Sequence, residues 1–421
     1  MHPTVVLHRA PWLLPMARPV ISDGAVVLAG KRLFAVDRFT DLKVRYPEAA
    51  IVDHPDCVLM PGLVNAHIHL ELSHLAHLAH QGKGKHFVDW LTVMLAERER
   101  LGAVGPHVEK AAGDAMQAQH DDGVVALADI GNTGVNCSLT YDFPGRLFPF
   151  VEYLGLGRKS LLPALKKLAQ QDDAVFCTAH APYSTHPRLI CALKKRADRL
   201  GHTFPIHVAE PASETGLLSA GTGAMADFLK RRGFYEDVFH QEIFHQAPID
   251  ITGSVQYLHN LGVLNEKTLC VHGVHVSTDE IQLLAQSRAK VCLCPGSNRF
   301  LQVGKAPLPD YLAYGILPAL GTDSAASNPE LSIWREMRLL AEDHPVVDPF
   351  TILQMATIGG AQSLGIEQQY GTLAQGKAAL LLCVSIGSSI TGPVDLVEHL
   401  VHNGPGNRNK IQWLHVGGEE Q

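Results

Sequence analysis

Residues 59–67 read LMPGLVNAH, a short apolar run that ends in polar residues. Seven similar runs follow, with helix-like stretches between them. They are GVVALADIG (123–131), LFPFVEYLG (147–155), AVFCTAHA (174–181), FPIHVAE (204–210), TLCVHGV (268–274), AKVCLCPGS (289–297) and LPALGTDS (317–324). Strands that are apolar throughout are buried on both faces, and their alternation with helices indicates parallel βαβ units.

Eight such strands are the number that closes a TIM-type (β/α)8 barrel, so an α/β barrel is the predicted fold. An open doubly wound sheet is the alternative. No GxGxxG or GxxxxGK[ST] motif follows any run, so the sequence shows no loop for a nucleotide phosphate. The long stretch between the fifth and sixth runs, residues 213–265, is expected near the barrel mouth as a lid or wall.

The two ends of the chain differ from this middle. The first part contains short strand-like segments with turns, and GTLAQGKAALLLCVSI (371–386) and WLHVGG (413–418) have the same character. We therefore expect residues 1–58 and 368–421 to form one discontinuous β-sandwich domain. Residues 59–367 would then form the barrel.

The composition excludes several classes of function. Of 421 residues, 46% are hydrophobic and 18% are charged, which is enough apolar material for a large core. With a net charge of -7 and 6% aromatic residues, a surface for nucleic acid or an anionic membrane is not expected. The eight cysteines form no CxxC pair. No apolar run approaches the roughly 18 residues that cross a bilayer, so we expect a cytoplasmic protein.

Histidine is the unusual component, with 24 residues. Side chains at the carboxyl ends of barrel strands face the active site, and His67, His69, His207 and Asp323 all follow such strands. His67 and His69 alternate along the first strand and therefore point to one side. Three nitrogens and one carboxylate bind a borderline metal and leave room for water. We expect one divalent ion here, zinc in preference to iron.

Two more residues near these ends suit proton transfer. Glu210 follows His207 by three residues, and a carboxylate beside a metal-bound water can take its proton and pass it on. His272, on the sixth strand, can polarise the attacked atom or stabilise the hydroxide.

Four other side chains are candidates for substrate contact. His180 ends the fourth run, where packing explains it equally well. Arg146 and Arg158, interpreted as following the third strand, could bind a carboxylate or ribose group, and solvated loop charges are an equal alternative. Trp90 could stack on a base, but its place in an apolar stripe over 86–101 favours core packing.

Eight motifs occur in order along the chain. They are PGLVNAHIHLELS (61–73), HAPYS (180–184), HVAE (207–210), VHGVHV (271–276), CPGSN (294–298), GTDSAASN (321–328), MATIGGAQSLG (355–365) and GTLAQGK (371–377). Together they resemble the amidohydrolase superfamily, and within it the mononuclear-metal deaminases and chlorohydrolases. The resemblance implies that the four side chains chosen above bind the metal. It also implies that Glu210 shuttles protons with His272 as its partner, and it supports a β-sandwich built from both ends.

The sequence departs from that pattern at several points. Gly296 stands in Pro-Gly-Ser-Asn where Pro-Arg-Ser-Asn is usual, and Ala378-Ala379 stand where Ala-Asp often occurs. Leu-Glu-Leu-Ser at 70–73 is unlike the Met- and Arg-rich stretch of S-adenosylhomocysteine and methylthioadenosine deaminases, and it looks like that of aminodeoxyfutalosine-deaminase-like members. No lysine ends the fourth strand to bridge two metals, which argues against a binuclear type.

We therefore predict a hydrolase acting on C–N bonds, a metal-dependent deaminase that releases ammonia from an aminated heterocycle. The predicted substrate is an adenine nucleoside with a modified 5′ end, of the aminodeoxyfutalosine, S-adenosylhomocysteine or methylthioadenosine type. The metal would lower the pKa of bound water towards about 7. Glu210 would move its proton to a ring nitrogen, while Asp323 and His272 hold the hydroxide and pass the second proton to the leaving amine.

Three alternatives stay open on the sequence alone. One is guanine deamination, and another is the same site with a different leaving group, such as chloride from a triazine or an amide nitrogen. The third is a non-catalytic barrel that serves as an interaction module, although no ligand is lost. The expected partners are a small heterocyclic substrate and water, without nucleic acid or membrane. A homodimer is a further hypothesis, because lookalike enzymes are commonly dimers.

Overall fold

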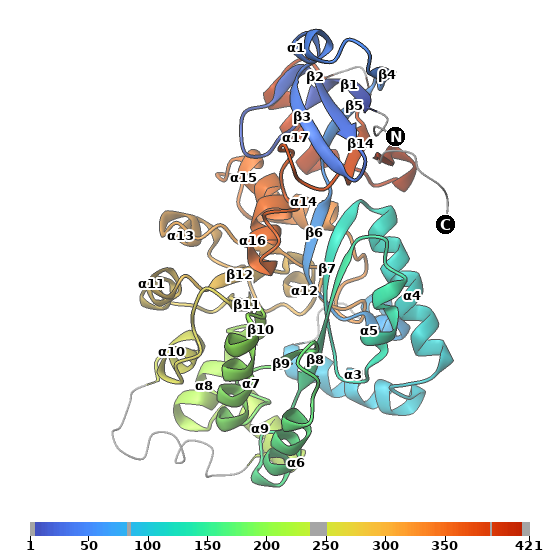
Figure 1. Cartoon of the computed structure of the whole chain (residues 1–421). Coiled ribbons are helices and arrows are strands. Elements are labelled where there is room, and N and C mark those ends of the chain that lie inside the picture. Colours follow the sequence, from blue (N-terminus) through green and yellow to red (C-terminus); the bar gives the residue numbers. More distant parts are fainter. Residues whose placement is uncertain (1–4, 82–85, 236–250, 388–389, 415–421) are drawn as a thin grey trace.

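The computed structural model describes residues 5–81, 86–235, 251–387 and 390–414. Its central part contains two parallel four-stranded sheets, in the orders β6-β7-β8-β9 and β10-β11-β12-β13 (Figure 1). These strands are β6 (Leu63–Ile68), β7 (Val124–Gly131), β8 (Arg146–Tyr153), β9 (Phe176–Ala179), β10 (Phe204–Val208), β11 (Thr268–His272), β12 (Lys290–Leu293) and β13 (Ala319–Leu320). Each overlaps one of the eight predicted runs.

Backbone hydrogen bonds join the two sheets at both edges. Beside β9 and β10, the amide of His207 donates to the carbonyl of His180 at 3.0 Å. Beside β13 and β6, the amides of Thr322 and Asp323 donate to the carbonyl of His67 at 2.9 and 3.1 Å. The eight strands therefore follow one another around a (β/α)8 barrel, as predicted.

The first predicted run is divided between two sheets. Its residues up to Pro61 belong to β5 (Cys57–Pro61), and the barrel strand β6 begins at Leu63. Gly62 lies between them, where a Cβ atom would come within 2.6 Å of the Cβ atom of Val125. A single strand over 59–67 is therefore not formed, because the chain passes from one sheet to the other at this tightly packed glycine.

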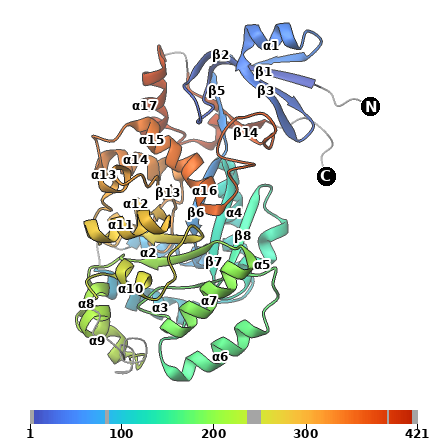
Figure 2. The same ribbon diagram turned by 60° about the vertical axis from the view of Figure 1, so that its left-hand side comes forward.

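Helices surround the barrel strands (Figures 1 and 2). In α7, a proline occupies the first turn and the side chain of His186 accepts a hydrogen bond from the amide of Arg188 at 3.2 Å, which caps the helix. The described helices of this part are α2 (His77–Gln81), α3 (Phe87–Leu101), α4 (Pro106–Asp121), α5 (Val135–Ser138), α6 (Arg158–Ala169), α7 (Pro187–Leu200), α8 (Ser213–Ala220), α9 (Ala224–Arg231), α10 (Ser254–Asn260), α11 (Thr278–Ser287), α12 (Pro295–Phe300), α13 (Leu308–Ala313), α14 (Ile333–Asp343), α15 (Pro349–Gln354) and α16 (Gly360–Leu364). None of the helices in the described residues has the length and apolar character that crossing a membrane requires.

Strands from both chain ends share a seven-stranded sheet, in the order β15-β14-β5-β1-β2-β3 with β4 paired to β1. The ends meet where β14 runs antiparallel to β5, with Cys383 opposite Leu59. Its other strands are β1 (Val5–Leu13), β2 (Ile21–Ala29), β3 (Arg32–Arg38), β4 (Ala50–Asp53), β14 (Leu381–Ser385) and β15 (Ile411–Leu414). The helices of these chain ends are α1 (Phe39–Arg45) and α17 (Pro393–Asn403), and α17 contacts α14 and α15. The end of the predicted WLHVGG strand, from residue 415, lies outside the described residues.

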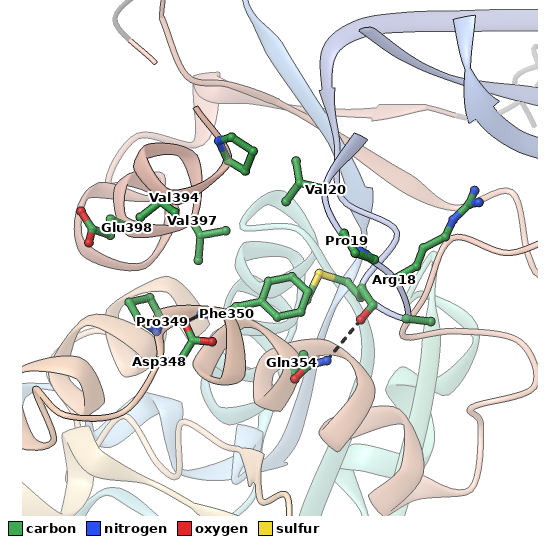
Figure 3. A pocket seen from close by; sticks show the side chains of 13 residues that line it. Arg18, Pro19, Val20, Asp348, Pro349, Phe350, Gln354, Val394, Val397 and Glu398 are labelled. Carbon is green, nitrogen blue, oxygen red and sulfur yellow. Dashed lines mark hydrogen bonds between the residues drawn. The ribbon is translucent and has the colours of Figure 1, made fainter. Parts of the chain in front are cut away.

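Within the predicted insertion at 213–265, the structure describes α8, α9 and α10, and residues 236–250 lie outside the described part. A groove of ≈ 490 Å³ lies elsewhere, between residues 16–20, the start of α15 and α17 (Figure 3). Its walls are largely apolar, with Phe350 at the centre of the view. No residue predicted for the active site lines it.

Candidate active site

Four predicted ligands converge at the carboxyl ends of the strands. The Nε2 atom of His207, on β10, lies 3.2 Å from the Nε2 atoms of both His67 and His69. The Oδ1 atom of Asp323, after β13, lies 3.5 Å from Nε2 of His67 and 3.6 Å from Nε2 of His69. All four residues are buried. The structure thus brings together residues that are up to 256 positions apart in the sequence, from 67 to 323.

Hydrogen bonds at the opposite ring nitrogens orient two of these histidines. Nδ1 of His69 donates to the carbonyl of Ile130 at 2.8 Å, and Nδ1 of His207 donates to the carbonyl of His180 at 2.7 Å. Their Nε2 lone pairs therefore face into the cluster, the usual arrangement of metal-bound histidines. Burial lowers the pKa of His67 to about 3 and the pKa of His207 well below its usual value, so both rings are neutral.

These atoms fit a divalent metal ion. Ligand atoms in a tetrahedron at the usual zinc–nitrogen distance of about 2.0–2.1 Å stand roughly 3.3–3.4 Å apart. The four separations given above, 3.2 to 3.6 Å, match that spacing. Converging nitrogen lone pairs beside a carboxylate repel one another unless a cation lies between them. The donor set therefore suits a cation such as zinc.

Two serines hold the carboxylate of Asp323. Its Oδ2 atom accepts hydrogen bonds from Oγ of Ser297 at 2.5 Å and from Oγ of Ser327 at 3.0 Å, which leaves Oδ1 directed at the histidines. Burial alone would raise the pKa of Asp323, but the neighbouring histidines, His67 first, hold it well below its usual value. The aspartate is therefore ionised, as a metal ligand must be.

Glu210 and His272 lie next to this cluster. An oxygen of Glu210 is 3.6 Å from Nε2 of His272, and both side chains are buried. Nδ1 of His272 lies 3.0 Å from Oδ1 of Asn298 and donates to it, so Nε2 is left as an acceptor facing Glu210. Burial raises the pKa of Glu210 well above its usual value, and the charges of Asp323 and Glu214 raise it further. A carboxyl group with a raised pKa holds a proton more readily than an exposed carboxylate, which suits a group that carries a proton.

Three non-glycine residues at these strand ends have left-handed backbone conformations. They are Ala209 (φ 54), His272 (φ 75) and Asp323 (φ 57). Such conformations cost free energy and persist where the surroundings impose them, most often at functional sites. Here the carbonyl of Ala209 accepts backbone hydrogen bonds from Val274 and His275 at 2.9 and 2.8 Å, which ties the end of β10 to the loop after β11.

Glu214, at the start of α8, supports the Ala209–Glu210 turn. Its Oε2 atom accepts a hydrogen bond from the amide of Glu210 at 3.3 Å, and the side chain is fully buried. Burial raises the pKa of Glu214 to about 7. A buried carboxyl group at the start of α8 therefore holds the turn that carries the predicted proton shuttle.

The structure explains the unusual Gly296. A Cβ atom there would lie 2.4 Å from Oε1 of Glu336 and 2.7 Å from Nδ2 of Asn328. The amide of Gly296 instead donates to Oε2 of Glu336 at 2.6 Å, and Asn328 donates to Oε1 at 2.8 Å. Burial raises the pKa of Glu336 to about 7. The space that a longer side chain would need is thus taken by a buried carboxyl group from α14.

The four candidates for substrate contact fall in different places. His180 lies in the site, with its ring centroid 4.7 Å from that of His207. Trp90 packs in the core, and its Nε1 donates to the carbonyl of Ala326 at 3.1 Å. Arg146 begins β8 at the amino end of the barrel, so the interpretation that it follows this strand is wrong. The side chain of Arg158 lies outside the described residues.

Several buried polar residues near the site are not among the candidates chosen from the sequence. Ser297, Asn298 and Ser327 stand in the CPGSN and GTDSAASN motifs, and their polarity at strand ends was the available signal. Glu152, near the end of β8, interrupts an apolar run just as His180 does. Glu214 had no signal of its own, because its contact with Glu210 depends on how α8 packs.

The comparisons with known proteins agree with the motifs. The family model described as the amidohydrolase family matches residues 58–401. A 5-methylthioadenosine/S-adenosylhomocysteine deaminase from Nitratidesulfovibrio vulgaris is 29% identical over 435 residues, covering 96% of this chain and 88% of the relative. An aminodeoxyfutalosine deaminase from Deinococcus radiodurans is 27% identical over 355 residues, covering 82% of each chain.

A solved structure confirms the fold. The crystal structure of an adenosine deaminase from Xanthomonas campestris with bound zinc superimposes with a TM-score of 0.76 at 24% identity, covering 96% of this chain and 90% of that one. Because the family model spans most of the sequence, including every residue of the candidate site, the chain belongs to the amidohydrolase family.

Proposed function

We propose that this chain is a metal-dependent deaminase that hydrolyses the exocyclic amine of an adenine nucleoside with a modified 5′ end. The observation that carries the proposal is the convergence of His67, His69, His207 and Asp323 at tetrahedral spacing, with Glu210 beside them. The substrate class is supported by the relatives, which are named as deaminases of methylthioadenosine, S-adenosylhomocysteine and aminodeoxyfutalosine.

The same four residues would hold one metal ion, and zinc is the proposed ion because the donor set suits it. When bound, such an ion supplies a Lewis acid that makes water a nucleophile near neutral pH. The chain's own residues then have to position the ring and move protons.

Glu210 is the proposed proton carrier. Burial raises its pKa, which makes it a stronger base towards water than an exposed carboxylate and keeps the proton available for a ring nitrogen. Asp323, His272 and Glu210 each place one polar atom within 4.8 Å of the other two. This triangle can pass the second proton to the leaving amine. Water and the aminated ring are consumed, and ammonia and an oxo ring are formed.

The test is ammonia release by zinc-loaded and iron-loaded protein from a panel of nucleosides and bases. The panel contains methylthioadenosine, S-adenosylhomocysteine, aminodeoxyfutalosine, adenosine, guanine and an aminated triazine. We expect release from a 5′-modified adenine nucleoside, loss of release after chelation, and normal activity in the control E342Q, whose carboxylate is half exposed on α14. No release from any adenine nucleoside by protein with one bound metal equivalent would refute the proposal.

A further inference from the structure

A buried carboxylate on β8 has one oxygen without a partner. Glu152 is 5% exposed, and its Oε2 atom accepts a hydrogen bond from Nδ2 of Asn132 at 3.0 Å. Its Oε1 atom has no hydrogen-bond partner among the described residues. Leaving a buried polar atom unpaired costs free energy, which a partner from outside the chain would recover.

The free oxygen faces the candidate active site. Nε2 of His180 lies 4.0 Å from Oε1 of Glu152. One polar atom from each of Glu152, His180 and His207 lies within 4.8 Å of the other two. Since His207 belongs to the metal cluster, a substrate held there lies next to this oxygen.

A second metal ion does not fit this position well. Nδ1 of His207 already donates to the carbonyl of His180, and its Nε2 faces His67 and His69 at 3.2 Å. Both nitrogens of His207 are therefore engaged. Only Glu152 and His180 are left, and two protein ligands are fewer than a bound metal ordinarily has.

The separation of these two atoms suits a hydroxyl group that bonds to both of them. Oε1 of Glu152 and Nε2 of His180 are 4.0 Å apart, so one oxygen can stand about 2.8 Å from each. Nδ1 of His180 lies 2.6 Å from Oγ of Ser184, and when it accepts that hydroxyl proton, Nε2 carries a hydrogen. A hydroxyl group can then donate to the carboxylate and accept from the imidazole.

A chain of hydrogen bonds fixes the carboxylate in place. Oδ1 of Asn132 accepts from Nη2 of Arg98 at 2.9 Å, and the same nitrogen donates to Glu71 at 2.8 Å. Glu71 also accepts from the amides of Asn132 and Thr133, both at 3.0 Å. The glutamate of the Leu-Glu-Leu-Ser stretch therefore orients Asn132, whose Nδ2 must face Glu152.

We propose that Glu152 and His180 together bind one sugar hydroxyl of the substrate, so that the site selects hydroxylated nucleosides over their deoxy counterparts. This inference rests on the proposed deaminase function. The Glu152 carboxylate supplies the acceptor, His180 supplies the donor, and the Glu71–Arg98–Asn132 chain keeps the acceptor oriented.

The variant E152Q separates this role from a structural one. Because Nδ2 of Asn132 needs an acceptor, the oxygen of the new amide faces Asn132 and its nitrogen faces the substrate. An acceptor is thereby exchanged for a donor with little change in shape. E342Q, on the exposed face of α14, is the matched control.

The experiment measures kcat/KM for methylthioadenosine and its 2′-deoxy and 3′-deoxy analogues, in wild type, E152Q and E342Q. A hydrogen bond to a charged group predicts that the wild type favours methylthioadenosine over one deoxy analogue by roughly 10- to 100-fold. We expect E152Q to lose that preference while keeping its activity on the same analogue, and E342Q to behave as wild type. Equal use of all three nucleosides by the wild type would overturn the inference without any variant.

Equilibrium binding of the same three nucleosides separates the inference from the proposed function. If no ammonia is released but methylthioadenosine binds more tightly than one analogue, and E152Q abolishes that difference, the deaminase proposal fails and the hydroxyl site stands. If ammonia is released with no preference among the three, the hydroxyl site fails alone. A second bound zinc equivalent that E152Q removes would also overturn it, in favour of a metal site.

Discussion

The two ends of the barrel are built on opposite principles. At the carboxyl ends of the strands, buried histidines and carboxyl groups meet, and Ala209, His272 and Asp323 have left-handed backbones. At the amino ends, apolar packing dominates: Gly62 packs on Val125, and Trp334 is 1% exposed with its Nε1 donating to the carbonyl of Asp122 at 2.9 Å. The chemistry at the mouth therefore depends on buried polar groups and strained backbone conformations, whose cost in free energy is offset by apolar packing elsewhere.

The largest effect is expected from E210Q at the mouth. Removing the proton carrier should lower kcat by about 10²–10⁴-fold, the usual contribution of general acid–base catalysis. Stability should not fall, because the glutamine avoids placing a charge in a buried position. Metal analysis, thermal unfolding and ammonia release on one preparation test this. Normal turnover would remove Glu210 from the mechanism.

At the amino end, the variant W334A should lower the stability of the fold and leave catalysis unchanged. Truncating this buried tryptophan should cost about 3–5 kcal/mol of unfolding free energy. The kcat per folded molecule should stay near the wild-type value, since Trp334 bonds to Asp122, which precedes β7 at the amino end of the barrel. Urea denaturation followed by assay of the folded fraction gives both numbers. A large drop in kcat with unchanged stability would contradict the division between the two ends.

The same division explains what the sequence could predict. His67, His69, His207 and Asp323 each end an apolar run, so strand periodicity alone places them at one mouth. The error at Arg146 came from a strand boundary, since β8 begins at that residue and not before it.

Other features depend on contacts between distant segments. A glycine is needed at position 296 because Glu336, forty positions later, occupies the space beside it. The roles of Glu214 and Glu152 depend on the packing of α8 and on the loop after β7. No local pattern reports such contacts, so periodicity could locate the site but not its supporting residues.

A smaller effect at the mouth is expected from S297A. Losing the hydroxyl that holds Oδ2 of Asp323 should weaken metal binding by roughly 10- to 100-fold, as is typical of residues that orient a ligand. Competition with a chelator of known affinity measures it. S287A, at the end of α11, is the control and should bind metal as the wild type does. If S297A bound the metal as tightly as the wild type, Ser327 alone would be sufficient to hold Oδ2 of Asp323.

The last effect, gradual in pH, concerns a buried carboxyl group at the amino end. Burial raises the pKa of Asp122 to about 7, so the folded state holds this proton more tightly than the unfolded chain. The resulting stabilisation is present at low pH and is lost as pH rises from about 4 through 7, at no more than roughly 1.4 kcal/mol per pH unit. D122N should therefore show a flatter pH dependence of urea stability. An unchanged slope would contradict the raised pKa.

The central claim is that one metal ion on His67, His69, His207 and Asp323 activates water for deamination. Titrating metal-free protein with zinc, while bound metal and ammonia release from methylthioadenosine are measured together, tests it most directly. We predict that activity rises in proportion to bound zinc and stops at one equivalent, while E210Q binds the same equivalent without turnover. Full activity in the metal-free protein, or activity that appears only with a second equivalent, would contradict the claim.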